Sequence, residues 1–410
     1  MKGLIEGLRS GSWLTRERMR GYALILIGAH LLAIIALVVT TRGNVDYAGR
    51  PLGTDFSDVW TAGRLALLGR PTEIYNPVLH HAMQQATFHR ADIPFYGWHY
   101  PPFFLLIAVA LAWMPYALAL AVWQGATLPL YLAGMRAIRR EPMALLLALA
   151  YPAVFINLTH GHNGFLSAAL IGGALVLLPG RPWLAGVLFG LLAYKPQFGL
   201  FIPIALAASG RWRSFASAAL TVVLLTAVTT AAFGVDIWRA FAANTAFTRN
   251  VVLEQGGAGF YKVMSAFAAV RMWGGSIPLA YGAQGVVTAF GAVGVALLWR
   301  SSADLRLKGA GLMAACLIGT PYCLDYDFMI LAPALALYAS YAWDTGFRPY
   351  ERSLLFVIYA TPLFARAVAH YTLLPAGFAA ALGMFVLVLV RARSDLAGTA
   401  AAGATAPAIA

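Results

Sequence analysis

Charged side chains are scarce in this chain. Asp, Glu, Lys and Arg together make up 11% of its 410 residues, only 16 residues are acidic, and 60% are apolar. Soluble globular proteins have about 25% charged and about 45–50% apolar residues. This composition excludes a soluble enzyme and a disordered chain. Cysteine is equally scarce, with Cys316 and Cys323 alone, so a disulfide scaffold is excluded as well.

The apolar residues form repeated stretches of the length that crosses a lipid bilayer, separated by short polar breaks. They predict an all-α polytopic membrane protein with 10–13 transmembrane helices. The apolar stretches cover about 22–39, 103–135, 142–157, 164–178, 183–208, 214–233, 262–299, 309–320, 328–343, 351–369 and 373–390.

The net charge of +13 does not indicate nucleic-acid binding. The cations gather in short clusters beside the apolar stretches, as in cytoplasmic loops of membrane proteins, and no soluble basic domain remains to bind nucleic acid. These clusters are Arg16, Arg18 and Arg20; Arg136, Arg139 and Arg140; Arg211 and Arg213; Arg300, Arg306 and Lys308; and Arg391 and Arg393.

The charge distribution predicts the organisation of the chain. Residues 1–21 form a cytoplasmic tail, and 22–392 form one transmembrane domain. Cations and acids balance within 40–100, which is therefore predicted to be a first external loop with short helices lying against the membrane. A second external loop covers 234–261, and 393–410, rich in Ala, Gly and Thr, form a disordered cytoplasmic tail.

Two apolar stretches have an ambiguous topology. Met114-Pro115-Tyr116 interrupts 103–135, and Lys195-Pro196 interrupts 183–208. Proline kinks or ends a helix. If one stretch is a hairpin and the other a single crossing, Arg211 and Arg213 are cytoplasmic in both cases. The side on which residues 160–163 lie stays open.

Ionisable groups close to apolar segments are candidates for function. Asp55 and Asp58 follow the first apolar stretch and would share one face of a helix. Two carboxylates so placed can raise one pKa and give a general base. Capping of an interfacial helix by Thr54 or Asp55 explains the pattern equally well.

Two further candidates carry positive charge or aromatic character. His99 and Tyr100 lie in an aromatic run before Pro101-Pro102; such a run anchors a chain at the membrane interface, but His99 can also meet a phosphate or a sugar hydroxyl. Lys195 lies within an apolar stretch beside a proline. A helix break there can line a cavity, and a cation in such a cavity suits an anionic phosphate.

No cofactor is indicated. Asp325 and Asp327 form an Asp-x-Asp pair before an apolar stretch, and its oxygens can bind a divalent metal, but helix capping accounts for the same pattern. A divalent metal is thus compatible with the sequence without being indicated. The histidines lack the spacing of a zinc site, and no phosphate-binding loop for ATP occurs.

The motifs follow one another in a recognisable order. They are Asp55; Trp60-Thr61-Ala62-Gly63; Leu68-Gly69-Arg70-Pro71; Ile74-Tyr75-Asn76-Pro77; Tyr100-Pro101-Pro102; Gly161-His162-Asn163-Gly164; Tyr194-Lys195-Pro196; and Pro321-Tyr322 with Tyr326-Asp327. In this order the chain, over about residues 20–390, resembles glycosyltransferase family 87. That family has the GT-C membrane fold and includes mycobacterial mannosyltransferases that build phosphatidylinositol mannosides from polyprenyl-phosphomannose.

The resemblance implies an inverting transfer of mannose or another hexose or pentose from a polyprenyl-phosphate donor. The acceptor is a lipid or a lipid-linked glycan at the outer face of a bacterial cytoplasmic membrane. Asp55 would be the catalytic base, with Asp58 as the alternative. Lys195, and less directly His99, would bind the donor phosphate. The resemblance places these further residues at the substrates: Trp60, Tyr75, Tyr100, His162, Asn163, Asp325 and Asp327.

The chain departs from the family pattern at two places. The family commonly has Gly-Gln before the Asn where this chain has Gly161-His162, and some members have a His in the late external loop where this chain has Asp325 and Asp327. The alternative hypothesis is a secondary transporter or lipid flippase, since broken helices and intramembrane charge also suit transport. The chain lacks the repeated halves typical of such transporters.

Overall fold

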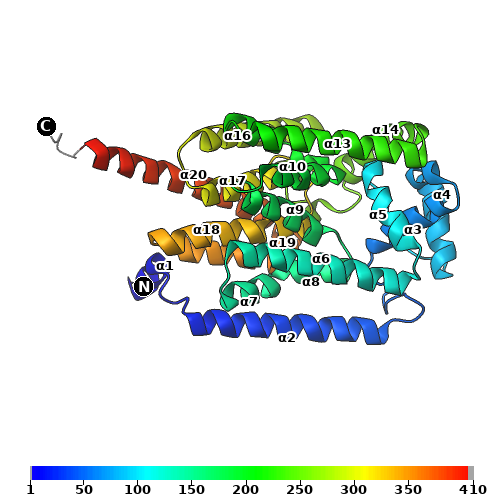
Figure 1. The fold of residues 1–410 in the computed structure, drawn as a ribbon. Helices are drawn as coiled ribbons and strands as arrows, with labels where there is room; N and C mark the ends of the chain where they lie inside the picture. The colour runs from blue at the N-terminus through cyan, green and yellow to red at the C-terminus, as the bar shows by residue number, and fades with distance from the viewer. Residues whose placement is uncertain (1, 405–410) are drawn as a thin grey trace.

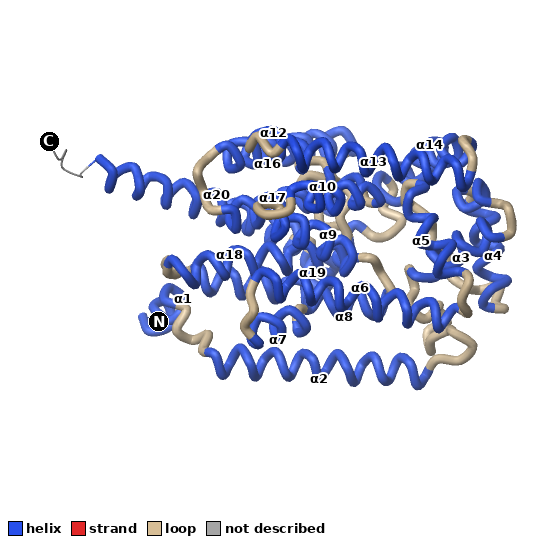
Figure 2. The backbone as a smooth tube through the Cα atoms, viewed as in Figure 1, coloured by secondary structure: helices blue, strands red, loops and turns tan. Residues whose placement is uncertain are grey.

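The computed structural model describes residues 2–404 and is all-α. No β-strand occurs in this range (Figure 2). Six of its helices are long and apolar enough to cross a membrane, and α7 with α8, bent by 52° at Tyr151, makes a seventh if the pair is one span. The long helices are α2 (Arg16–Thr40), α6 (Tyr116–Ile138), α13 (Trp212–Phe233), α16 (Ile277–Arg300), α19 (Glu351–Thr372) and α20 (Ala376–Ala404). The chain is therefore a polytopic membrane protein.

Shorter helices fill the space between and beyond these spans (Figure 1). They are α1 (Lys2–Ser10), α3 (Phe56–Leu67), α4 (Pro77–Phe88), α5 (Leu105–Ala112), α7 (Pro142–Ala150), α8 (Pro152–His160), α9 (Gly164–Leu177), α10 (Pro182–Leu191), α11 (Pro196–Gly199), α12 (Ile202–Ala208), α14 (Asp236–Phe247), α15 (Ala266–Met272), α17 (Leu305–Ile318) and α18 (Leu331–Thr345). Single turns of tighter helix are η1 (Pro71–Tyr75), η2 (Pro102–Phe104), η3 (Leu192–Tyr194), η5 (Phe260–Lys262) and η6 (Asp325–Ile330), and η4 (Thr248–Glu254) is a wider π-helical turn. Many of them begin with proline at the first helical position, where its missing N–H costs nothing.

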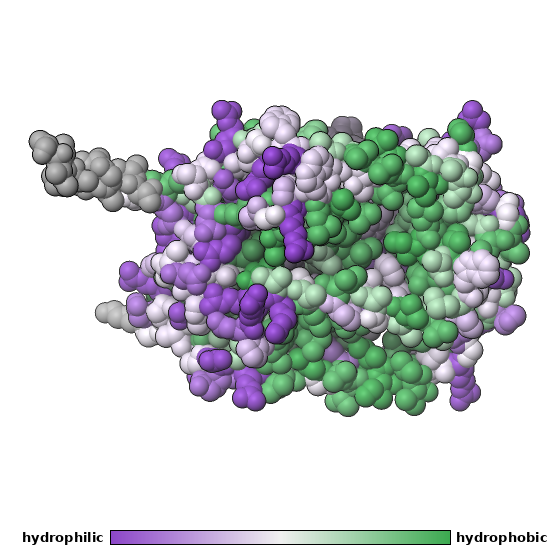
Figure 3. Space-filling model, in the orientation of Figure 1, coloured by the Kyte–Doolittle hydropathy of each residue, from purple (hydrophilic) through white to green (hydrophobic). Residues whose placement is uncertain are grey.

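The cation clusters lie at one end of the bundle. Asp344 accepts from both Arg139 and Arg306 there, and the backbone N–H of Tyr350 donates to Arg9 at 2.7 Å. Both termini of the described chain lie at this end, and hydrophilic side chains gather on it (Figures 1 and 3). The opposite end has α3, α4 and α14. The bundle thus has the charge asymmetry of a membrane protein with one cytoplasmic end.

The structure resolves the topology of the two interrupted stretches. The hydroxyls of Ser214 and Ser217 donate to Pro182 and Trp183 at 2.8 and 2.7 Å, so α10 and α13 start side by side. Residues 182–211 therefore leave the cation-rich end and return to it as a hairpin. The stretch 103–135 crosses once, through α6, while α5 packs on α3 at the far end (Figure 1). Residues 160–163 consequently lie at the same end as Asp55.

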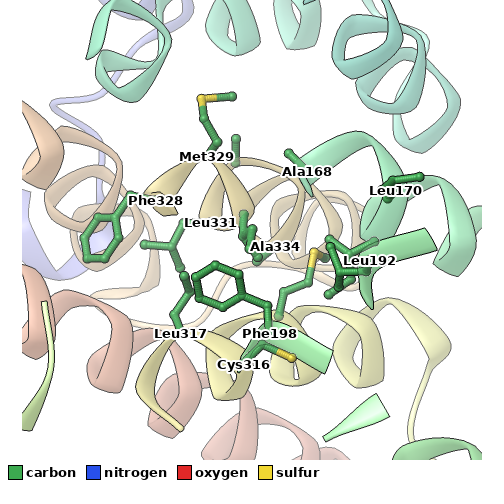
Figure 4. Packing of buried hydrophobic residues seen from close by; sticks show 14 of the residues in the cluster. Ala168, Leu170, Leu192, Phe198, Cys316, Leu317, Phe328, Met329, Leu331 and Ala334 are labelled. Atoms are coloured by element: carbon green, nitrogen blue, oxygen red, sulfur yellow. The ribbon is translucent and has the colours of Figure 1, made fainter. Parts of the chain in front are cut away.

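The centre of the bundle is formed by α17 and α18, whose side chains are almost all buried. Figure 4 shows Cys316 and Leu317 of α17 facing Leu331 and Ala334 of α18, with Phe198 of α11 between them. Both cysteines are buried free thiols. This apolar centre fixes η6, which leads directly into α18, and therefore fixes the position of Asp325 and Asp327.

The segment 40–100 contains the short helices α3, η1 and α4. The tail differs from the prediction: α20 continues past Arg393 to Ala404, so the first part of the segment predicted to be disordered is helical. Arg391 binds Glu351 of α19 at 2.8 Å, and the Tyr341 hydroxyl of α18 donates to Asp395 at 2.7 Å, so these contacts hold the beginning of that tail against the bundle. Residues 405–410 of the tail lie outside the described residues.

Candidate functional site

Four chain segments meet near the start of α3. Gly161 has φ +60°, and a Cβ built on it would lie 2.6 Å from Phe56 Cβ and 3.2 Å from the carbonyl oxygen of Gly53. Only glycine permits both this backbone conformation and this approach. The Tyr100 hydroxyl lies 3.3 Å from His162 Nε2, and the His162 ring stacks on Tyr326 at 3.4 Å. The loops before α5, α9 and α18 therefore converge on the helix that carries Asp55.

Asp55 lies at the N-cap position of α3 but makes no capping hydrogen bond. Among the described residues its carboxylate makes no hydrogen bond or ion pair, although it is only partly exposed. Burial raises the pKa of its carboxyl, opposed by the charge of His160 and reinforced by the charge of Asp325. Helix capping thus does not explain Asp55. A carboxylate that has no partner and a raised pKa is suited to accept a proton.

Asp58 lies one turn further along α3 and is 5% exposed. Its Oδ1 is buried without a hydrogen-bond partner in the described chain. Burial raises the pKa of Asp58 well above its usual range, and the neighbouring Asp55 carboxylate raises it further. Two carboxylates this close favour one shared charge. The more exposed Asp55 is the better placed of the two to meet a substrate.

Lys195 forms a buried ion pair. Its Nζ donates to Asp327 Oδ1 at 2.5 Å, and the two side chains are 4% and 2% exposed. The backbone N–H of Leu324 donates to the other oxygen of Asp327 at 3.0 Å. The helix break predicted at Pro196 is present, between η3 and α11. The charge of Lys195 is balanced in place, which the sequence did not indicate.

Asp325 is also paired, with Arg366 of α19. An antiparallel bridge joins Val263 to Leu324, and the backbone N–H of Met264 donates to the carbonyl oxygen of Cys323 at 2.7 Å, so the segment that carries Lys262 lies beside the segment that carries Asp325. The two carboxylates of the Asp-x-Asp pair therefore bind different cations: Asp325 binds Arg366, and Asp327 binds Lys195. No group of three or more metal-binding side chains occurs within residues 2–404, and a metal at this pair would have to displace both ion pairs.

The aromatic candidates have different positions. The Tyr75 hydroxyl donates to the carbonyl oxygen of Tyr100 at 2.9 Å and so fixes the loop that carries Tyr100. Trp60 faces away from the site: its indole N–H donates to Met114 at 3.0 Å. The structure thus brings Tyr100 to the site, gives Tyr75 a contact that supports it, and places Trp60 in the packing of α3.

His99 and Asn163 offer hydrogen-bonding groups. His99 Nδ1 lies 2.8 Å from Thr248 Oγ1, and burial lowers the pKa of His99 to about 4, so its ring is neutral near pH 7. Asn163 is 2% exposed, and both polar atoms of its side chain lack a partner in the described chain, as does His162 Nδ1. Buried polar groups are almost always hydrogen-bonded. The unpaired atoms of His162 and Asn163 therefore point to a polar ligand.

Comparison with known proteins gives the family. The model of glycosyltransferase family 87 matches residues 98–324, more than half of the chain. The chain belongs to glycosyltransferase family 87. No curated protein and no solved structure matches it. The matched range contains Tyr100, His162, Asn163 and Lys195, whereas Asp55 lies before it.

Membership of this family supports the prediction of a membrane glycosyltransferase over the alternative of a transporter or flippase. It also agrees with the all-α, multi-pass architecture. A lipid-linked sugar donor is implied by such a membrane enzyme.

Some residues of the candidate site escaped the sequence analysis. Lys262 and Arg366 both lie close enough to Asp55 to lower its pKa, as does His160. The signal for Arg366 was available, because it is a cation inside the predicted apolar stretch 351–369, where ionisable residues are candidates for function. Lys262 is the first residue of the predicted apolar stretch 262–299, so the same signal was available for it and was not used.

Proposed function

We propose that this glycosyltransferase inverts the anomeric centre of a sugar, mannose or another hexose or pentose, that it takes from a polyprenyl-phosphate donor. The acceptor is a hydroxyl of a lipid or a lipid-linked glycan. The observation that carries the proposal is Asp55: it is a partly buried carboxylate without a partner in residues 2–404, beside Lys262 and Arg366. A base and a set of cations side by side are what attack by a hydroxyl and departure of a phosphate require.

In the proposed reaction, Asp55 takes the proton of the acceptor hydroxyl as its oxygen attacks C1 of the sugar. The bond between C1 and the donor phosphate oxygen breaks from the opposite side, which inverts C1, and the polyprenyl phosphate leaves with the electron pair. Asp58 is the alternative base, but its deeper burial suits it better to raising the proton affinity of Asp55. Tyr100, His162 and Asn163 would bind hydroxyls of the sugar.

The phosphate charge needs an uncompensated cation. Lys195 and Asp327 balance each other, and so do Arg366 and Asp325. Lys262 has no ion-pair partner in the described chain, and its charge lies close enough to Asp55 to lower the pKa of that carboxyl. We therefore assign the net positive charge at the phosphate to Lys262. Lys195 and the neutral His99 stay in the proposal as hydrogen-bond donors beside the phosphate.

The proposed location is the outer face of a bacterial cytoplasmic membrane. It is supported by the position of Asp55 at the end opposite the cation clusters, because cytoplasmic loops are enriched in Lys and Arg. The donor phosphate would then lie at the outer headgroup level, with its polyprenyl chain in the bilayer.

The test is sugar transfer by the purified protein in lipid, with a radiolabelled panel of polyprenyl-phosphate sugars and a membrane-lipid extract as acceptor. Wild type and Asp55→Asn are compared with Asp236→Asn, which makes the same change at an exposed site on α14. Transfer by wild type and Asp236→Asn, and none by Asp55→Asn, is the expected result. Full activity of Asp55→Asn would overturn the assignment of the base. No turnover of any donor by folded wild type would overturn the reaction, and flux assays for the transporter alternative would follow.

A further inference from the structure

A cavity lies far from Asp55, on the cation-rich half of the molecule. Its volume is about 740 Å³, and α2, α7, α18 and α19 enclose it. The helix α2 runs along the outside of the bundle (Figure 1) and is only 6% buried in its apolar part, so one wall of the cavity stands in the lipid. The deep lining is apolar, with Leu26, Leu335, Ala336, Ala360 and Leu363 among its residues.

The mouth of this cavity is basic. Arg16, Arg139 and Arg352 line it together with one acid, Glu141. Arg139 binds Glu141 at 2.7 Å and also pairs with Asp344. Neither Arg16 nor Arg352 has an ion-pair partner among the described residues. Two uncompensated guanidinium groups therefore stand where an apolar cavity opens to the cytoplasmic membrane surface.

Contacts from the N-terminal segment hold this mouth in place. The Trp13 indole N–H donates to Ser353 Oγ at 3.0 Å, and Ser353 donates to the carbonyl oxygen of Leu8 at 2.8 Å. The Arg352 guanidinium lies 4.7 Å above the ring of Phe347. Its side chain also packs against Gly11, where a Cβ would lie 2.5 Å from Arg352 Cβ. The position of Arg352 is thus built into the fold.

The length of the cavity matches the thickness of one lipid leaflet. Its lining follows α2 from Arg16 to Leu26 and α19 from Arg352 to Leu363, which is about 15–17 Å at 1.5 Å per helical residue. Half of a bilayer's hydrocarbon core is about 15 Å thick. An apolar cavity one leaflet deep with a basic mouth fits the acyl chains and the anionic headgroup of one phospholipid.

We propose that this cavity is a binding site for an anionic phospholipid of the cytoplasmic leaflet. Its phosphate lies between Arg16 and Arg352, and its acyl chains lie along α2, α18 and α19. The site is separate from the proposed transferase site, which is at the other end of the bundle, and does not depend on the proposed reaction.

The test uses the full-length protein in nanodiscs of phosphatidylcholine with increasing fractions of phosphatidylglycerol, and counts bound phosphatidylglycerol by native mass spectrometry. Three proteins are compared: wild type, the double variant Arg16→Gln/Arg352→Gln, and the matched double variant Arg213→Gln/Arg300→Gln. The last removes the same charge from exposed cytoplasmic positions on α13 and α16, outside the cavity. Monodisperse elution shows that each variant is folded.

Wild type and the matched variant should retain one phosphatidylglycerol, and Arg16→Gln/Arg352→Gln should bind it about 30-fold more weakly, since each basic residue contributes about a factor of five. Equal loss in both variants would overturn the proposal in favour of nonspecific surface charge. A third variant, Ala336→Phe, fills the deep part. It should also lose the bound phosphatidylglycerol; phosphatidylglycerol binding unaffected by the arginine substitutions, or retained in Ala336→Phe, would overturn the proposal.

Discussion

The ion pair between Lys195 and Asp327 yields the sharpest prediction, because both side chains are almost fully buried. Lys195→Met keeps the length of the side chain and removes its charge, which leaves the Asp327 carboxylate buried with one backbone donor, Leu324 N–H. Removing one partner of a buried pair costs about 3–5 kcal/mol. Asp327→Asn alone leaves the Lys195 ammonium without its counter-ion and should cost a similar amount.

The double variant Lys195→Met/Asp327→Asn should be much less destabilised than the sum of the two single variants. It buries no charge, and the Asn oxygen can still accept from Leu324, whose unpaired N–H would otherwise cost about 1–3 kcal/mol. We expect the double variant to lie within about 2 kcal/mol of wild type. The coupling energy of the cycle is then several kcal/mol.

The measurement is the free energy of unfolding of the four proteins in mixed detergent micelles, followed by tryptophan fluorescence. Additive effects of the two substitutions would refute the buried ion pair. Measuring sugar transfer by the same proteins separates the contribution of Lys195 to stability from its proposed contact with the donor phosphate. The stable double variant should keep measurable transfer at a reduced rate, because it keeps Lys262 and loses one hydrogen-bond donor at the phosphate.

The remaining predictions concern pH, the phosphate cation and helix packing. Burial raises the pKa of Asp55, and a base acts only when deprotonated, so kcat/KM should fall with decreasing pH at a midpoint above the ordinary value of about 3.9; a midpoint at or below that value would contradict the role. Lys262→Gln should weaken donor binding about tenfold or more, as loss of a hydrogen bond from a charged group does. Lys308→Gln, at the cation-rich end, is its control, and an unchanged KM for the donor would exclude Lys262. A Cβ on Gly63 would lie 2.1 Å from the Ala108 carbonyl oxygen, so Gly63→Ala should destabilise the protein by about 1–3 kcal/mol in thermal unfolding, whereas Gly125→Ala, with nothing within 4 Å, should not.

The class of fold was readable from the sequence because lipid imposes strong constraints. Every backbone polar group inside a bilayer must be satisfied within the protein, so long apolar segments form helices. The prolines at 115 and 196 also marked real helix breaks. The sequence did not show which of the two interrupted stretches is a hairpin and which crosses the membrane once, because both alternatives place Arg211 on the same side. It required the contacts of Ser214 and Ser217 with the start of α10.

The site was readable only in part. Asp55, Tyr100, His162 and Lys195 stood out by residue type and by their order along the chain, and the structure brings them to one region. The ion-pair partner of Lys195 could not be predicted from the sequence, because its pairing with Asp327 depends on how α11 and η6 pack. The sequence therefore gave no sign that the charge of Lys195 is already balanced.

The position of the site follows from the same constraint that determines the fold. Irregular backbone at membrane depth is tolerated where it is buried in protein or lines a cavity. Here the irregular segments before α5, α9, α11 and α18 all face one another, at the end where α3 covers the bundle. Buried side-chain atoms without a hydrogen-bond partner in the described chain include atoms of Asp58, His162 and Asn163, in the segments that meet near Asp55. A polar ligand at this place would satisfy them, so substrate binding and local stability should rise together. Binding of a non-transferable donor analogue should therefore slow hydrogen exchange at the starts of α3 and α9, and an unchanged exchange rate there would contradict this argument.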